Sequence, residues 1–180
     1  MNVILAIYRY LKLRLDKIFL AHHRRNLLKR VIGGSGLHLE GKIMVIHCER
    51  LTLGQNVHIG ADSFINCTGG VTIGDYTILS RHVTIYSYDH NFKDPGLLPY
   101  DNGIIPKPVH IGRYVWIGMN VTIAPGTEIG DGAVVGIGTV VSGKIPENAI
   151  VVSEKARIVG YRESEHTKTL VNEGKFYKIV

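Results

Sequence analysis

Cysteine and proline are scarce in this chain. Its 180 residues include only two cysteines, Cys48 and Cys67, too few for a disulfide framework, so we expect two unreactive thiols. Four of the six prolines fall between residues 86 and 110. They exclude a continuous helix or strand there, and we expect an ordered excursion or a lid. The length and the 45% hydrophobic content fit one modest domain with a sizeable core.

Acidic residues are almost absent from the first 30 positions. That segment holds eight basic side chains and one acid, a net charge of +7, whereas residues 31–180 carry −1 of the chain's total of +6. A long apolar run is also absent, because four basic residues interrupt positions 9–17, and the features of a signal peptide are missing. We therefore expect neither a membrane-spanning helix nor a secreted protein, and no basic patch interleaved with aromatics indicates nucleic acid.

Apolar side chains in residues 1–32 recur at helical spacing and predict an amphipathic helix with a basic flank. They are Ile4, Ile7, Tyr8, Leu11, Leu15, Ile18 and Phe19. Two interpretations stay open. The helix could cap the open end or side of the fold and cover an exposed strand edge. It could instead lie in an anionic membrane surface, which would make a cytoplasmic protein peripheral on the cytoplasmic face of the membrane.

The sequence repeats every six residues from Leu39 to about Pro146. Aliphatic residues stand at Leu39, Val45, Leu53, Ile59, Ile65, Ile73, Leu79, Ile85, Ile111, Ile117, Ile123, Ile129, Val135 and Val141. Small or β-branched residues usually follow four positions later. A short fixed period is typical of a parallel β-solenoid, in which stacked repeats bury a common core. We expect this all-β domain to span residues 33–160, with a tail at 161–180.

The phase of the repeat slips once in every three hexads. It slips by two residues after Val45 and again after Ile65, and by a whole loop, 86–110, after Ile85. Three hexads per turn predict a triangular prism, with strands of successive coils about 4.8 Å apart and all slips at one corner. Cys48 and Cys67 fall at this corner, off the positions expected to point inward. A long loop in a regular array is more often functional than accidental.

At the root of that loop, His90 lies between Asp89 and Asn91. Histidine is the side chain that can take up a proton near neutral pH and return it, and a neighbouring carboxylate can fix its tautomer. A hydroxyl acceptor needs such a base. By itself, however, His90 is one of nine histidines, and a surface loop histidine without a catalytic role is the simpler interpretation.

The segment Tyr-Asp-His-Asn-Phe at 88–92, combined with Val-Trp-Ile-Gly at 115–118 and the hexads around it, resembles the hexapeptide-repeat acyltransferases. Within them it is similar to the sugar O-acetyltransferases, including the galactoside and maltose acetyltransferases and the surface-polysaccharide branch. The similarity covers about residues 39–160. It implies a left-handed β-helix, a homotrimer with active sites between neighbouring solenoids, acetyl-CoA as cosubstrate, a sugar or glycan acceptor and no metal.

The resemblance also implies roles for single residues. His90, with Asp89 beside it, would deprotonate a sugar hydroxyl, which then attacks the thioester directly. The residues implied at the cofactor are Trp116, Gly118, Met119, Gly136, Ile137, Ser142, Lys144 and Arg157. The backbone N–H of Met119 would face the oxyanion. The residues implied at the acceptor are Asn66, Tyr88 and Asn91. Trp116 could serve only a contact between subunits, and Asn66 could be only a corner residue.

Some positions depart from the family pattern, and other functions stay open. Glu154 places an acid near Arg157, and Gly143 replaces a frequent lysine, so the cofactor contacts are less specific than the base. N-acetylation of an amino sugar would use the same base and cosubstrate, and a non-catalytic scaffold would keep only the fold. A carbonic anhydrase on this solenoid would need a three-histidine metal site. The candidates for it, His82, His90 and His110, lack the close pair that such a site requires.

Overall fold

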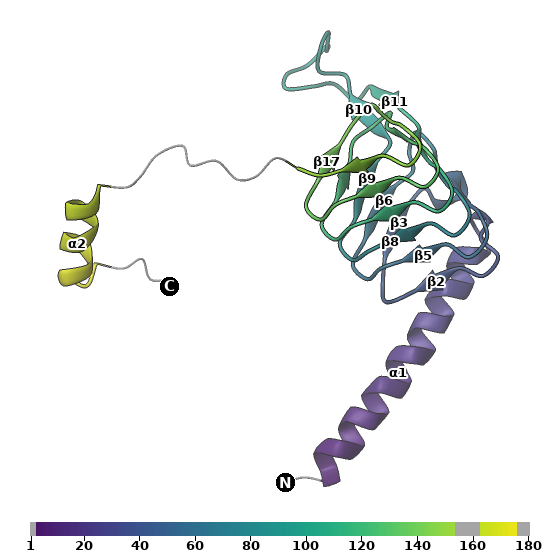
Figure 1. The fold of residues 1–180 in the computed structure, drawn as a ribbon, viewed down its shortest axis with the longest axis horizontal. Helices are drawn as coiled ribbons and strands as arrows, with labels where there is room; N and C mark the ends of the chain where they lie inside the picture. The colour runs from purple at the N-terminus through teal and green to yellow at the C-terminus, as the bar shows by residue number, and fades with distance from the viewer. Residues whose placement is uncertain (1–2, 154–162, 176–180) are drawn as a thin grey trace.

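The computed structural model describes residues 3–153 and 163–175, without the side chains of residues 3–10, 12, 13 and 167. A long helix, α1 (Val3–Leu28), leads into a prism of β-strands, and a shorter helix, α2 (Ser164–Asn172), lies in the segment expected to be a tail (Figure 1). Between them, the strands of successive coils stack in parallel on three faces. The chain is thus a left-handed parallel β-helix, as the hexads predict.

Each face of the prism is a ladder of short parallel strands. The first face holds β1 (Ile32–Gly33), β4 (Leu51–Leu53), β7 (Val71–Ile73), β12 (Val109–Ile111), β15 (Glu128–Ile129) and β18 (Lys144–Ile145). The second holds β2 (His38–Leu39), β5 (His58–Ile59), β8 (Ile78–Leu79), β13 (Trp116–Ile117), β16 (Val134–Val135) and β19 (Ile150–Val151). The third holds β3 (Met44–Ile46), β6 (Phe64–Asn66), β9 (Thr84–Tyr86), β14 (Thr122–Ile123) and β17 (Val140–Val141). The three predicted columns are therefore confirmed.

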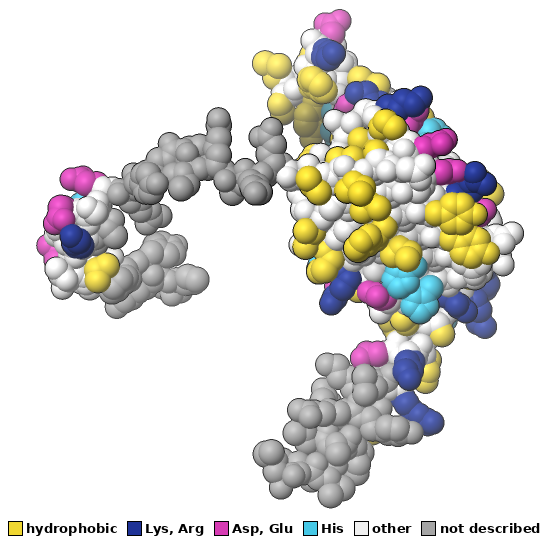
Figure 2. Space-filling model, viewed as in Figure 1, with side chains coloured by type: hydrophobic (Ala, Val, Ile, Leu, Met, Phe, Trp, Pro, Cys, Tyr) yellow, Lys and Arg dark blue, Asp and Glu magenta, His cyan; other side chains and the backbone are white. Residues whose placement is uncertain are grey.

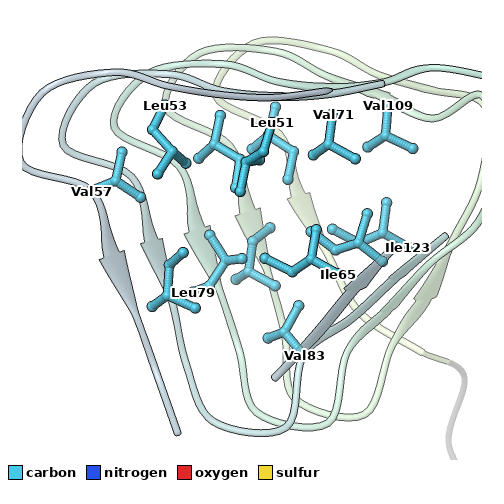
Figure 3. Close-up of a cluster of buried hydrophobic side chains, with 14 of the residues drawn as sticks. Leu51, Leu53, Val57, Ile65, Val71, Leu79, Val83, Val109 and Ile123 are labelled. Atoms are coloured by element: carbon cyan, nitrogen blue, oxygen red, sulfur yellow. The ribbon is translucent and has the colours of Figure 1, made fainter. Parts of the chain in front are cut away.

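The hexad aliphatics fill the centre of the prism (Figure 3). All are buried except Val45, which is half-buried and packs against the core. Equivalent residues stack coil upon coil, so that Ile65 pairs with Ile85 and Ile85 with Ile123. The small residues four positions later are buried too, and hydroxyls among them bond to carbonyls at the corners: Thr77 Oγ1 donates to Gly112 over 2.8 Å. This pairing satisfies polar groups that burial would otherwise leave without partners.

The phase slips all fall at the corner between the third and first faces, as predicted. A short 3₁₀ helix, η1 (Cys48–Arg50), occupies this corner in the first complete coil. Cys48 and Cys67 are free thiols and are both buried, so the prediction that they lie off the inward positions is wrong. The reason is that the extra residues at the slip fold back over the core, where the Cys67 N–H donates to Ile46 O over 3.0 Å. Burial raises the pKa of Cys67 to about 12.

Helix α1 lies against the prism along its C-terminal half, where Phe19 and Leu20 line a cavity with Glu40, Gly41 and Lys42. Leu27 is buried, and Leu20 and Leu28 pack against the core beneath the first coil. Upstream of these turns the helix projects away from the prism (Figure 1). Of the two interpretations of this segment, capping describes the C-terminal half of the helix, and the membrane interpretation stays a prediction. Within the described part of the chain, we find no helix long and apolar enough to span a membrane.

The loop expected at 86–110 is partly ordered as a hairpin. Strand β10 (Tyr88–His90) pairs antiparallel with β11 (Ile104–Pro106) at the edge of the prism, and the segment that joins them projects away from it (Figure 1). Between them, residues 91–103 form the tip. We call residues 88–106 the arm. Its prolines keep both strands to three residues each, so the prediction of an excursion rather than a continuous strand is confirmed.

Candidate active site

The arm is fixed to the prism at its base by Ser87. This side chain is fully buried, and its hydroxyl donates to Asn66 O over 2.7 Å and accepts from the Gly69 N–H at 2.8 Å. The Ser87 carbonyl accepts from the Lys107 N–H at 2.8 Å. A Cβ at Gly69 would overlap this carbonyl, so only glycine fits there. The sequence analysis missed Ser87, although its inward phase, two residues after the buried Ile85, was a usable signal.

His90 stands on β10 between two tyrosine rings. The Tyr100 ring stacks on the imidazole, with centroids 4.1 Å apart and planes 21° apart, and the Tyr88 ring meets it edge-on at 5.4 Å. The Nδ1 atom of His90 is buried and has no hydrogen-bond partner in the described part of the chain. Buried polar atoms are rarely left so, and those that are often belong to functional sites. The two tyrosine rings therefore hold the imidazole in place, and its Nδ1 atom is unpaired among the described residues.

Asp89 faces the opposite side of the same strand, because successive side chains of a strand alternate. Its carboxylate pairs with Lys107, Nζ to Oδ2 at 2.5 Å. The expectation that this carboxylate orients the His90 ring is therefore wrong for this structure. In its place, the two tyrosines hold the ring by packing. The sequence could not show this, because Tyr100 lies ten residues away.

Asn91 and Asp101 hold the tip of the arm together. The Asn91 amide donates to Asp101 Oδ2 over 2.9 Å and to Asp94 O over 2.8 Å. Asp101 also accepts from the N–H groups of Gly96 and Gly103, and these two bonds, followed by the one from Asn91, lower the pKa of Asp101. Asn91, predicted at the acceptor, thus uses its amide N–H groups inside the arm. Asp101 was missed, since nothing in the local sequence links it to residues before the turn.

Aromatic rings form a continuous row that leads to His90. Phe64 and Tyr86 on the outside of the third face lie 5.4 Å apart between centroids, and Tyr86 lies 6.0 Å from Tyr88. Tyr86, Tyr88 and His90 follow each other at intervals of two residues, so one side of the chain carries all three. Such rings offer a broad apolar surface with polar hydroxyl tips. The structure thus places Tyr88 beside His90, while Phe64, Tyr86 and Tyr100 were not anticipated.

Asn66 forms hydrogen bonds within a corner of the prism. Its Oδ1 accepts from Thr68 twice, from the backbone N–H at 3.0 Å and from the hydroxyl at 2.6 Å. The side chain is buried. Of the two roles left open for this residue, the structure shows the corner. Contact with an acceptor stays a prediction.

The predicted cofactor residues on the second face lie near one another. Trp116 is exposed on β13, and its Nε1 donates to Ser80 Oγ over 3.4 Å. The next corner stacks residues 118–119 of one coil on residues 136–138 of the following coil, where the Gly138 N–H donates to Met119 O over 2.8 Å. Met119 and Ile137 are exposed there. The N–H groups of Gly118 and Gly136 bond to the following coil and are not free for a ligand.

The other predicted cofactor residues lie elsewhere. Lys144 stands on the outside of the first face, with its Nζ 3.6 Å from Glu128 Oε2, so the structure does not bring it to the face that carries Trp116. Ser142 follows β17 at the corner from which the arm also leaves the prism. Arg157 lies outside the described residues. The predicted set is therefore divided among different sides of one chain.

His90 and Trp116 also belong to different sides. The arm leaves the corner between the third and first faces, whereas Trp116 lies on the second face, opposite that corner. Apolar side chains gather on the visible surface of the prism (Figure 2). Those exposed on the second face include Ile78, Trp116 and Ile150, which are successive or near neighbours in the ladder. No group of metal-ligating side chains able to hold an ion occurs in residues 3–153 or 163–175.

Two segments of the chain match models of hexapeptide-repeat families. Residues 108–143 match the bacterial transferase hexapeptide model of six repeats, and residues 50–80 match the hexapeptide repeat of succinyl-transferase. Both segments consist of prism coils. They lie on either side of the arm, which neither model includes.

Two curated proteins are similar along most of this chain. A protein of Mycobacterium tuberculosis named as an acetyltransferase is 37% identical over 131 residues, 72% of this chain, which spans only 44% of that relative's length. WbbJ of Escherichia coli K12, named for O-acetyl transfer in lipopolysaccharide biosynthesis, is 34% identical over 143 residues. That alignment covers 74% of this chain and 70% of WbbJ.

Solved acetyltransferases share the fold. A maltose O-acetyltransferase of Clostridium difficile 630 superposes with a TM-score of 0.65 at 28% identity, over 91% of this chain and 90% of that one. A galactoside acetyltransferase in complex with coenzyme A gives a TM-score of 0.61 at 28% identity, over 76% and 67% of the two chains. Repeat, fold and the extent of identity with WbbJ agree, and the chain belongs to the hexapeptide-repeat acetyltransferase family.

Proposed function

We propose that this acetyltransferase transfers the acetyl group of acetyl-CoA to a sugar hydroxyl, with His90 as the general base. The observation that carries the proposal is the His90 ring, packed between Tyr88 and Tyr100 with a buried Nδ1 that lacks a partner among the described residues. A fixed imidazole can take the hydroxyl proton as the oxygen attacks the thioester carbon, and can return it to the departing thiolate sulfur. No covalent enzyme intermediate is needed.

A carbohydrate acceptor is supported by the aromatic row that leads to the base. The rings of Phe64, Tyr86 and Tyr88 offer apolar faces on which a sugar ring can pack, while tyrosine hydroxyls can bond to its hydroxyls. The names of the relatives agree, since they include maltose, galactoside and lipopolysaccharide. We infer an acceptor in surface-polysaccharide or lipopolysaccharide synthesis.

We further infer that the working form is a trimer. Trp116, the resemblance-based cofactor contact, lies on the face opposite the corner that carries His90, so one chain does not bring the two together. A neighbouring copy can supply the missing side, and closed cyclic symmetry lets each copy do the same for the next. Each cleft would then combine the arm of one copy with the second face of another. The exposed apolar residues on that face fit such a contact.

The proposal is tested by replacing His90 with alanine and measuring thiol release from acetyl-CoA with a panel of sugars and amino sugars. Turnover of a sugar without an amine should fall roughly 100- to 10,000-fold, because the base is lost. Affinity for coenzyme A by calorimetry, and a mass near three times the 19.9 kDa chain by light scattering, should not change.

His110→Ala is the matched control, because His110 is exposed on the first face and should keep full activity. If His90→Ala keeps more than about a tenth of wild-type turnover, His90 is not the base. If the wild-type enzyme acetylates only the amino sugars of the panel, the reaction is N-acetylation and the proposed O-acetylation is wrong. An active monomer would contradict the shared cleft.

A further inference from the structure

Helix α1 carries apolar side chains on two opposite sides. On one side, Leu20 and Leu27 pack against the prism. On the other, Leu11, Leu15 and Ile18 are 52%, 65% and 66% exposed. Phe19, although exposed, lines a cavity with Glu40, Gly41 and Lys42 of the prism and does not belong to this side. At 3.6 residues per turn, Leu11 lies roughly half a turn around the helix from Leu20 and Leu27. We call Leu11, Leu15 and Ile18 the outer stripe. Capping the solenoid does not account for it.

Basic side chains border the outer stripe on one side. At 3.6 residues per turn, Arg14 and Arg25 lie beside the position of Ile18 around the helix, and Asp16 is the one acid in residues 1–30. Dark-blue basic side chains mark the described part of this helix in Figure 2. Residues 1–30 carry a net +7 while residues 31–180 carry −1, so the positive charge of the protein is concentrated here. A shallow cavity of about 500 Å³ on this helix is lined by Ile18, Ala21, Leu28 and the guanidinium-bearing Arg24 and Arg25, together with His22.

We propose that the outer stripe lies in an anionic lipid surface and holds the enzyme at the membrane. Apolar side chains would enter the boundary between headgroups and acyl chains, while the flanking Arg side chains would meet lipid phosphates. The cavity beside Ile18 and Arg25 suits the same chemistry, an anionic headgroup above an apolar chain, whereas the Arg24 guanidinium donates to Leu37 O in the prism. No helix in the described residues can span a bilayer, and this arrangement needs none, because the helix lies on the surface.

A second copy of the chain is the rival occupant of the outer stripe. Packing α1 of one copy against α1 of another would bring two segments of charge +7 together, and like charges at such distances repel. An anionic surface neutralises the same charges. Charge therefore favours lipid over self-association. Membrane attachment does not depend on the acetyl-transfer chemistry and can be measured without activity.

The test is co-sedimentation of the full chain with vesicles of phosphatidylcholine alone and with vesicles containing phosphatidylglycerol. Wild type should bind the anionic vesicles, bind the neutral ones little, and lose binding as salt screens the charges. The double variant Leu15→Asp/Ile18→Asp, and separately Arg14→Glu/Arg25→Glu, should each weaken binding at least about tenfold. Val171→Asp, an exposed apolar residue of α2, is the matched control and should bind like wild type.

The mass of each variant by light scattering separates the two occupants. Because the altered side chains are exposed, the variants should fold and keep the wild-type mass and thermal midpoint. A smaller mass for Leu15→Asp/Ile18→Asp would show that the outer stripe packs against another copy and would overturn the proposal. Equal binding to neutral and anionic vesicles, or binding to neither, would overturn it as well.

Discussion

Along the prism, each aliphatic side chain stacks on its equivalent one coil away, whereas the tip of the arm is held by amide groups and a carboxylate. Ile85 is fully buried between Ile65 and Ile123, while Leu98 at the tip of the arm is 90% exposed. The pKa shifts of titratable groups also have opposite directions in the two regions. Burial raises the pKa of Cys67 in the prism, and hydrogen bonds lower the pKa of Asp101 in the arm. Stability thus lies in one region and the candidate chemistry in the other.

The sharpest contrast is expected in the reactivity of the thiols. Cys67 is fully buried with a pKa of about 12, so its thiolate fraction at pH 8 is roughly a thousandfold below that of an ordinary thiol. In the folded protein, Cys67 should therefore react with a thiol reagent at least that much more slowly than it does in denaturant. Mass spectrometry of peptides after timed labelling follows Cys67 separately from Cys48. Rapid labelling of Cys67 in the folded state, located by mass spectrometry, would show that this corner opens.

A matched pair of truncations should separate the two regions by stability. Ile85→Ala removes buried methyl groups from the centre of the stack and should lower the free energy of unfolding by about 2–5 kcal/mol. Leu98→Ala removes exposed ones and should change it by less than about 0.5 kcal/mol. Urea unfolding followed by circular dichroism measures both values. Equal losses would mean that the arm, too, contributes to the stability of the fold.

The sequence predicts the prism better than the arm, because repeated burial determines the residues of the prism. A column residue such as Ile117 is specified by its own period, because every coil repeats the same burial. The prediction that Cys67 lies off the inward positions was wrong because the period fails there, at a corner whose extra residues fold inward. In the arm, no period exists. His90 could be found from the residues beside it, but Tyr100, Ser87 and Asp101 act through contacts that depend on how the chain returns.

The face on which a residue lies was also harder to predict than its burial. Lys144 and Trp116 were both expected at the cofactor, yet they stand on different faces, because position within a turn of three hexads decides the face. For α1, the period predicted one apolar side. It did not predict that a second side, with Leu20 and Leu27, packs on the prism. Tertiary contacts, which helical spacing does not encode, determine that second side.

Within the arm, a smaller effect is expected from Asp101→Asn. One carboxylate accepts hydrogen bonds from Asn91, Gly96 and Gly103, and an amide offers only one accepting oxygen. The tip should loosen, and kcat/KM for the acceptor should fall about tenfold while the thermal midpoint stays unchanged. Asp94→Asn is the control, because Asp94 serves the network through its carbonyl. Full activity of Asp101→Asn would exclude the tip from acceptor positioning.

The smallest predicted effect is the titration of Asp101 at low pH. The folded arm lowers the pKa of Asp101 from its ordinary 3.8, chiefly through the N–H groups of Gly96 and Gly103. A lowered folded-state pKa means that the stabilising bonds are complete above the unfolded value and are lost as pH falls through the lowered one. The carboxyl carbon of Asp101 should therefore titrate by NMR with a midpoint below 3.8, and Asn91→Ala should raise that midpoint only partly. A midpoint at or above 3.8 would show that the two amides do not hold the carboxylate in solution. In that case the arm would be ordered by packing around His90, as the prism is by its core.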